Sequence, residues 1–153
     1  MKFKSLSALE SYLKNAIDIA LENQVADMVK DEVAASASEV VYDAYNPSQY
    51  SRRLSLERAE NIGIYVSGNV LTATMNHVFN EEYKTDNHGY GLAYLIEYGH
   101  GAGGYYDYPY SRKTPTFLEP RPFVETAIER MDSYKTHVHA LKEGLESQGI
   151  NVK

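Results

Sequence analysis

A long stretch without Pro or Gly, from Ser7 to Tyr42, most constrains what this 153-residue chain can fold into. Ser7 and Glu10 have the spacing of a capping box, which predicts that a helix begins there. An unbroken helix of this length would measure about 50 Å, more than the width of a small globule. Either it breaks near 34–38, or part of its apolar stripe packs on a second copy of the chain. That stripe recurs at every fourth residue: Leu9, Leu13, Ile17, Leu21, Val25, Val29, Val33, Ala37 and Val41.

The most regular apolar pattern predicts a second long helix near the C-terminus. Pro122 is tolerated in the first turn of a helix, and Gly149 is suited to end one. Spacings of three and four alternate along the pattern, as in helices that pack along one another, so we expect this helix to lie on the first. Its members are Val124, Ala127, Met131, Tyr134, Val138, Leu141 and Leu145.

Alternating residues between the two predicted helices indicate a β-hairpin. Strands are expected over 62–66 and 70–75, and Ser67–Asn69 can form the turn. Residues 92–96 have the spacing of a short helix that Gly99 would stop. The length suits one core, and no internal repeat is present, so residues 1–153 are expected to form a single domain.

The segment over 99–116 combines many glycines with many tyrosines, and we expect no regular structure there. Eight of the 14 Tyr lie between Tyr83 and Tyr110. Tyrosine offers a large contact area and one hydrogen-bonding hydroxyl for little loss of side-chain entropy, which is why interfaces favour it. Two interpretations stay open from composition: an arm that becomes ordered on meeting a neighbour, and a loop in which the tyrosines are incidental.

Composition excludes several classes of function. The chain has no Cys, so disulfides, thiolate nucleophiles and Cys-ligated metals are ruled out. No signal peptide and no run of 18 apolar residues is present, so we expect synthesis inside the cell and no membrane partner. A net charge of -6 argues against a protein that grips nucleic-acid phosphates, because such binding needs clustered Lys and Arg.

The residues alone identify no catalytic centre, no metal site and no cofactor. Neither a nucleophile elbow nor a phosphate-binding loop with its Gly-Lys-Ser/Thr ending occurs. A metal site can be drawn around Glu97, His100 and Asp107, although nothing in their spacing fixes the ligands. A small metal-dependent hydrolase or host-directed effector with that site is therefore the alternative to a role without catalysis.

Two motifs, in this order, resemble the neck and tail-completion proteins of long-tailed bacteriophages, also called head-tail connector or minor tail proteins. The first is Ala93-Tyr94-Leu95-Ile96-Glu97-Tyr98-Gly99-His100-Gly101, and the second, after a Gly-rich insert, is Pro120-Arg121-Pro122-Phe123-Val124-Glu125-Thr126-Ala127. The stretch from Tyr42 to Arg53, with Tyr-Asn-Pro and Arg-Arg, is similar to the version found in phages of Gram-positive hosts. The similarity runs from the N-terminal helix to about Arg130.

The resemblance implies a structural virion protein, without catalysis or cofactors, at the joint between the DNA-filled head and the tail. It implies an α+β fold with a long N-terminal helix, a small antiparallel sheet and a C-terminal helix. The expected partners are further copies in a ring and other neck or tail proteins, namely the stopper, the tail terminator or the tail tube. DNA would pass through the ring without specific binding, helped by the acidic charge. The protein would occupy the host cytoplasm during assembly and then the virion, and its tier within the neck stays open.

Within this resemblance, several residues are expected to act in structure or at an interface. Glu97 is expected to cap a helix or to pair with Arg121 or Arg52, and Gly99 to supply a positive φ that turns the chain into the arm. The full set of interface or structural candidates is Tyr94, Glu97, Gly99, Tyr105, Tyr106, Tyr108, Tyr110, Arg121 and Phe123.

Overall fold

The computed structural model of the protein describes residues 3–44, 55–75, 92–98 and 120–152. Its N-terminal part is one long helical rod, and its C-terminal part adds two shorter helices. The rod consists of α1 (Leu6–Ala20), the π-turn η1 (Leu21–Val25), α2 (Ala26–Ala37) and the π-turn η2 (Ser38–Tyr42). The remaining elements are the 3-10 turns η3 (Ser55–Glu57) and η4 (Ala59–Asn61), strands β1 (Ile62–Ser67) and β2 (Val70–Met75), and helices α3 (Leu92–Tyr98), α4 (Phe123–Tyr134) and α5 (Thr136–Ser147).

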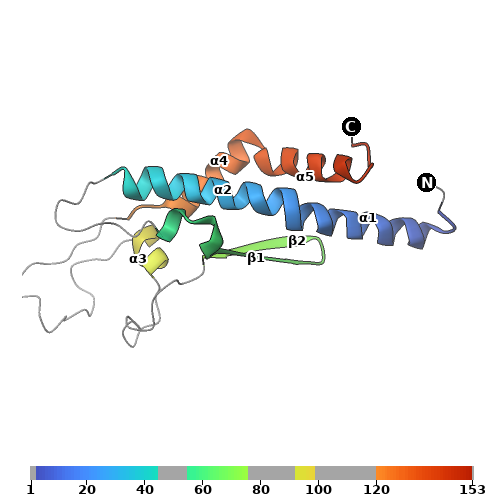
Figure 1. Ribbon diagram of the computed structural model, residues 1–153, viewed down its shortest axis with the longest axis horizontal. Coiled ribbons are helices and arrows are strands. Elements are labelled where there is room, and N and C mark those ends of the chain that lie inside the picture. The colour runs from blue at the N-terminus through green and yellow to red at the C-terminus, as the bar shows by residue number, and fades with distance from the viewer. Residues whose placement is uncertain (1–2, 45–54, 76–91, 99–119, 153) are drawn as a thin grey trace, which may run out of the picture.

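The rod lies at the centre of the molecule, between two outer layers. Figure 1 shows α4 and α5 along one side of it, and the β-hairpin and α3 along the other. Helix α4 packs on α2, whereas α5 packs on α1 and η1. The α+β prediction, with a C-terminal helical segment packed on the N-terminal helix and a small antiparallel sheet, is confirmed.

The rod does not break near 34–38, so that one of the two alternatives is wrong. Helical structure runs from Leu6 to Tyr42 without interruption, and Ser36 and Ala37 are fully buried within it. The other alternative, a second copy covering part of the stripe, is not tested by a single chain.

Two π-turns keep the apolar stripe facing the core. A spacing of four residues advances about 400° around an α-helix, so a strict four-residue stripe drifts by about 40° at each step. A π-turn has more residues per turn and therefore rotates the following residues back. The six stripe members from the first π-turn onward are all buried: Leu21, Val25, Val29, Val33, Ala37 and Val41.

The start of the rod differs from the predicted capping box. Ser5, not Ser7, is the N-cap, and its hydroxyl accepts a hydrogen bond from the Ala8 backbone N–H at 3.1 Å. Glu10 instead pairs with Lys14, one turn further on, at 2.8 Å. Serine is a favoured N-cap residue at either position, and Ser5 takes the role because the helix begins at Leu6, two residues earlier than a cap at Ser7 would place it.

The predicted hairpin is confirmed, and its turn explains the register. Strands β1 and β2 pair antiparallel from Ile62↔Met75 to Ser67↔Val70, which leaves Gly68 and Asn69 as a two-residue loop. Both have positive φ, 60° and 64°, as the tight hairpin turn that matches strand twist requires. Ile62 is buried, and Ile64, Val66, Leu71 and Met75 pack against the core.

Asn69 also fastens the hairpin turn to α1. Its backbone N–H and side-chain amide donate to Asp18 Oδ1 at 2.9 and 3.0 Å, and the amide also donates to the Lys14 carbonyl at 2.9 Å. A two-stranded hairpin is marginally stable by itself, so this attachment and the apolar face hold it in place.

Replacing Asn69 with Ala is expected to lower the free energy of unfolding by about 1–2 kcal/mol, because hydrogen bonds are lost and alanine disfavours positive φ. Asn69→Gly keeps the turn geometry and isolates the loss of the side-chain bonds, about 1 kcal/mol. Urea denaturation measures both, and Thr72→Ala, an exposed change in the same hairpin, serves as the control. Wild-type stability of Asn69→Gly would show that the attachment contributes nothing.

The C-terminal segment is two helices rather than the one that the stripe predicts. Lys135 adopts a left-handed conformation, with φ 53° and ψ 31°, and ends α4 one residue before α5 begins. The imidazole of His137 bonds through Nδ1 to the Met131 carbonyl in the last turn of α4 at 3.0 Å, which gives that carbonyl a partner at the bend. The bend lets α4 follow α2 while α5 approaches α1 and η1. Helix α5 ends just before Gly149 as expected, where Gly149 N–H bonds to Glu146 O and Ile150 N–H to Leu145 O.

Candidate functional site

Glu97 joins the two sequence motifs that lie on either side of the Gly/Tyr segment. It sits in the last turn of α3, is only 7% exposed, and points its carboxylate at the first turn of α4. Its Oε2 accepts from the Val124 N–H and its Oε1 from the Glu125 N–H, both at 2.9 Å. These donors have no partner inside the helix, and the N-terminal end of a helix favours a negative charge. The expected capping role of Glu97 is therefore met.

Arg121 connects the same place to the end of the rod. Its backbone N–H donates to the Ile96 carbonyl at 2.8 Å, which ties the approach to α4 onto α3. Its guanidinium Nη1 donates to the Val41 carbonyl in η2 at 3.3 Å. A cation near the last carbonyls of a helix is favourable, because that end carries a partial negative charge.

Phe123 opens α4 at this point, and its side chain is completely buried. We call the set formed by Val41, Ile96, Glu97, Arg121 and Phe123 the helix-end junction. It brings together three helix ends that are far apart in the sequence: the end of the rod, the end of α3 and the start of α4. Glu97, Arg121 and Phe123, which belong to the two motifs, therefore hold these helix ends together.

The other predicted site residues are not placed by the structure. Tyr94 belongs to α3, and its side chain is not among those described. The remaining candidates lie outside the described residues: Arg52, Gly99, His100, Tyr105, Tyr106, Asp107, Tyr108 and Tyr110. The interface role of the tyrosines and the alternative metal site stay predictions.

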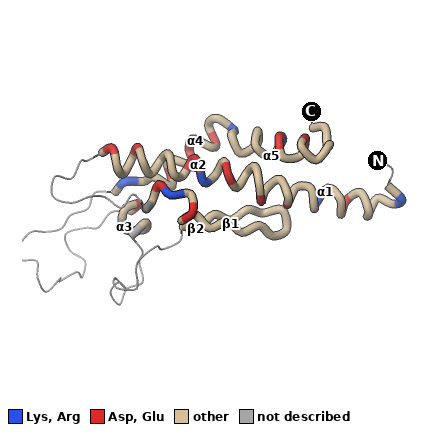
Figure 2. The backbone as a smooth tube through the Cα atoms, in the orientation of Figure 1, with Lys and Arg blue, Asp and Glu red and all other residues tan. Residues whose placement is uncertain are grey.

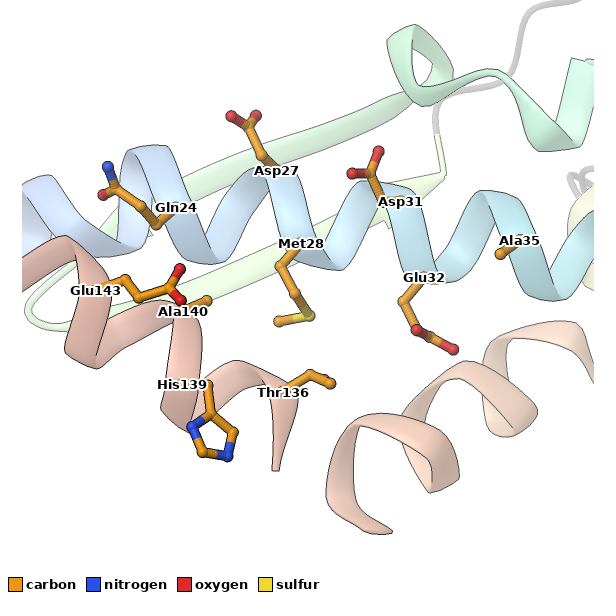
Figure 3. Close-up of a pocket in the computed structure, with 10 residues that line it drawn as sticks. All are labelled: Gln24, Asp27, Met28, Asp31, Glu32, Ala35, Thr136, His139, Ala140 and Glu143. Carbon is orange, nitrogen blue, oxygen red and sulfur yellow. The ribbon is translucent and has the colours of Figure 1, made fainter. Parts of the chain in front are cut away.

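An acidic groove lies between α2 and α5, with a volume of about 650 Å³. Figure 3 shows Met28 reaching from α2 toward α5, with Glu143 on one side of it and Glu32 on the other. Asp27 and Asp31, one turn apart on α2, also belong to its lining, and their carboxylates point to the side of α2 away from α5 (Figure 3). None of its lining residues is Lys or Arg. The full lining is Gln24, Asp27, Met28, Asp31, Glu32, Ala35, Thr136, His139, Ala140 and Glu143.

The groove was not foreseen from the sequence. The four-residue spacing of Asp27 and Asp31 places them on one helix face, but only the fold shows which helix faces them. Within the described ranges, no three His, Asp or Glu side chains are arranged to hold a metal ion. Nor does any described helix have the length and apolar character to cross a membrane.

A second unforeseen feature is an ion-pair network next to the groove. The Arg130 guanidinium of α4 contacts Glu39 at 2.6 Å and Glu32 at 3.8 Å. The hydrogen bond to Glu39, aided by the nearby carboxylates, raises the pKa of Arg130 above its ordinary value. The network links α4 to α2 and η2 across the side of the rod.

The N-terminal end of α1 carries apolar side chains that the rest of the described chain leaves accessible. Leu6 is 81% exposed, Phe3 40% and Leu13 39%. Figure 1 shows the first turns of α1 projecting beyond both the hairpin turn and the end of α5. Figure 2 shows a basic residue at this tip, whereas most charged residues along α2 are acidic. We call residues 3–15 the projecting end.

Comparison with known proteins places the chain in a family. No curated protein and no solved structure matches it. One family model does match, over residues 5–147, a range that includes the rod, the hairpin, the helix-end junction and both C-terminal helices. The chain therefore belongs to the YomN family, and this membership supports a bacteriophage or prophage origin.

Proposed function

We propose that this YomN-family protein is a non-enzymatic structural protein of the phage neck, which completes the head-tail joint as a ring subunit. It works in the host cytoplasm during assembly and then remains in the virion. Its partners are further copies of itself and other neck or tail proteins, among them the stopper, the tail terminator or the tail tube.

The use of Glu97 is the observation that carries this proposal. A buried carboxylate is a common candidate for acid–base or metal chemistry. Here both of its oxygens accept backbone N–H groups at the start of α4, so the group is committed to holding two helices together. A motif whose described residues hold helices together fits a structural protein that acts by binding other proteins. The acidic groove supports the proposal further, because acidic walls do not retain DNA phosphates.

Deleting the gene from the phage or prophage that encodes it tests the proposal. We expect DNA-filled heads and separate tails in electron micrographs of the lysate, and at least a hundred-fold loss of infectious particles. A plasmid copy should restore joined particles, and mass spectrometry should detect the protein in purified virions. Joined, infectious particles without the protein would contradict the proposal.

The metal-dependent hydrolase or effector remains the second candidate from the sequence, and no described residue favours it. Its two other residues, His100 and Asp107, lie outside the described ranges. Elemental analysis of the purified protein separates the two functions, since a stoichiometric metal that is lost on Glu97→Gln substitution would favour the hydrolase.

A further inference from the structure

The projecting end continues a helix face that is covered elsewhere in the molecule. Ala16 and Ala20 of α1 are 2% and 0% exposed, because α5 packs on them. The Gln148 side chain reaches the Ala16 carbonyl at 2.9 Å, at the end of that contact. Spacings of three and four residues carry the same face back toward the N-terminus through Leu13, Leu9 and Leu6. Toward the N-terminus this face therefore presents Leu6, which is 81% exposed, Leu13, which is 39% exposed, and Leu9, which is partly buried.

The projecting end also differs in charge from the rest of the chain. Residues 3–15 contain Lys4, Lys14 and a single acid, Glu10, whereas the whole protein has a net charge of -6. The pair between Lys14 and Glu10 has both side chains more than 60% exposed. Such a surface pair contributes little to stability, so Lys14 can take another partner at small cost.

The acidic groove is complementary to the projecting end in charge, and it also offers apolar surface. Four acidic residues line it, Asp27, Asp31, Glu32 and Glu143, of which Glu32 also contacts Arg130 at 3.8 Å, and its lining holds no basic residue besides His139. Met28 and two alanines, Ala35 and Ala140, supply apolar surface between those carboxylates. An apolar ridge flanked by lysines would meet apolar contact at the centre of this groove and opposite charge at its edges.

We propose that the projecting end of one copy docks into the acidic groove of a second copy. Leu6, Leu9 and Leu13 form the inserted ridge, and Lys4 and Lys14 face the carboxylates of α2 and α5. The two surfaces lie on different parts of the molecule, so the contact is head-to-tail and each copy can both give and receive it. This contact specifies how subunits would join in the proposed ring, and it rests on that proposed role.

Light scattering after size-exclusion chromatography tests this contact with the full chain. We expect the wild type to form assemblies larger than one chain, and Leu6→Glu to reduce the mass to that of one chain. Leu6 is 81% exposed, so the fold should survive, which circular dichroism and thermal melting verify. Ile128→Glu is the matched control, because Ile128 is 57% exposed on α4, outside both surfaces.

Charge reversal distinguishes a head-to-tail contact from other modes of association. One variant reverses the charge of the projecting end (Lys4→Glu with Lys14→Glu), and a groove-reversed chain reverses that of the acidic groove (Asp31→Lys with Glu143→Lys). Each variant alone should associate at least about ten-fold more weakly than the wild type. Mixed in equal amounts, they should associate again, because each then offers a complementary surface to the other. Full association of the groove-reversed chain alone would overturn the inference, since it would show that the groove is not the receptor.

The inference and the proposed function can fail separately. A wild-type chain that stays monomeric at its highest soluble concentration overturns the head-to-tail contact, whereas the gene deletion decides the role at the head-tail joint. Intact virions from the deletion strain, combined with charge-dependent association in solution, would leave the contact standing and remove the neck role.

Discussion

Replacing Gly144 with Val is expected to lower the free energy of unfolding by about 3 kcal/mol or more, the largest effect we expect from one substitution. A Cβ at this position of α5 would lie 2.6 Å from Ala20 Cβ and 3.1 Å from Ala20 Cα. It would also lie 2.7 Å from Gln24 Oε1, which can move. The Ala20 backbone cannot move without shifting the rod, so α5 must withdraw from α1 and η1.

Gly144→Ala gives a finer measurement of the same contact, with an expected cost of about 1–3 kcal/mol. The matched test combines it with Ala20→Gly, which removes the nearer of the two Ala20 atoms. The double variant should be more stable than the sum of the single effects predicts, by at least about 0.5 kcal/mol. Additive effects in urea denaturation would contradict the close approach of α5 and the rod.

The second large effect is expected from Glu97→Ala, which should lower the free energy of unfolding by about 2–4 kcal/mol. The substitution leaves the Val124 and Glu125 N–H groups at the start of α4 without their acceptors, and it removes a favourable charge from that helix end. Glu97→Gln keeps the shape and one acceptor oxygen, so its cost should be smaller. Chemical denaturation measures both variants.

Glu125→Ala is the control for this prediction. Glu125 is also acidic and lies in the first turn of α4, but it is exposed. Its removal should cost no more than about 0.5 kcal/mol. An equal loss for Glu97→Ala and Glu125→Ala would show that charge near the helix end matters and that the buried cap does not.

The sequence predicts the elements whose pattern is local. The four-residue stripe between Leu9 and Val41 specifies the rod, and alternation over 62–75 specifies the hairpin, because in both cases one face must be buried. The packing of the C-terminal helices on the rod follows from the same argument, because the apolar stripes of both are buried when they pack together.

Features that depend on contacts between distant residues could not be predicted. Nothing in a lysine marks Lys135 as left-handed, and the stripe runs through it without a break. The bend follows from the demand that α4 and α5 pack on different parts of the rod. The acidic groove and the Arg130 network likewise arise only when α2, α4 and α5 are side by side. Glu97 could be predicted as a cap from its motif, but only the fold shows that it caps the start of α4.

The π-turn η1 lies in the rod between the projecting end and α2, and it fixes the azimuth of the helix faces on either side of it about the rod axis. A π-turn winds by fewer degrees per residue than the about 100° of an α-helix, so the same five residues wound as an α-helix would rotate the projecting end relative to the acidic groove by several tens of degrees. In an assembly of head-to-tail contacts, this angle decides whether the chain of subunits closes or continues as an open helix. In the proposed assembly, the curvature would therefore depend on one π-turn inside a single subunit.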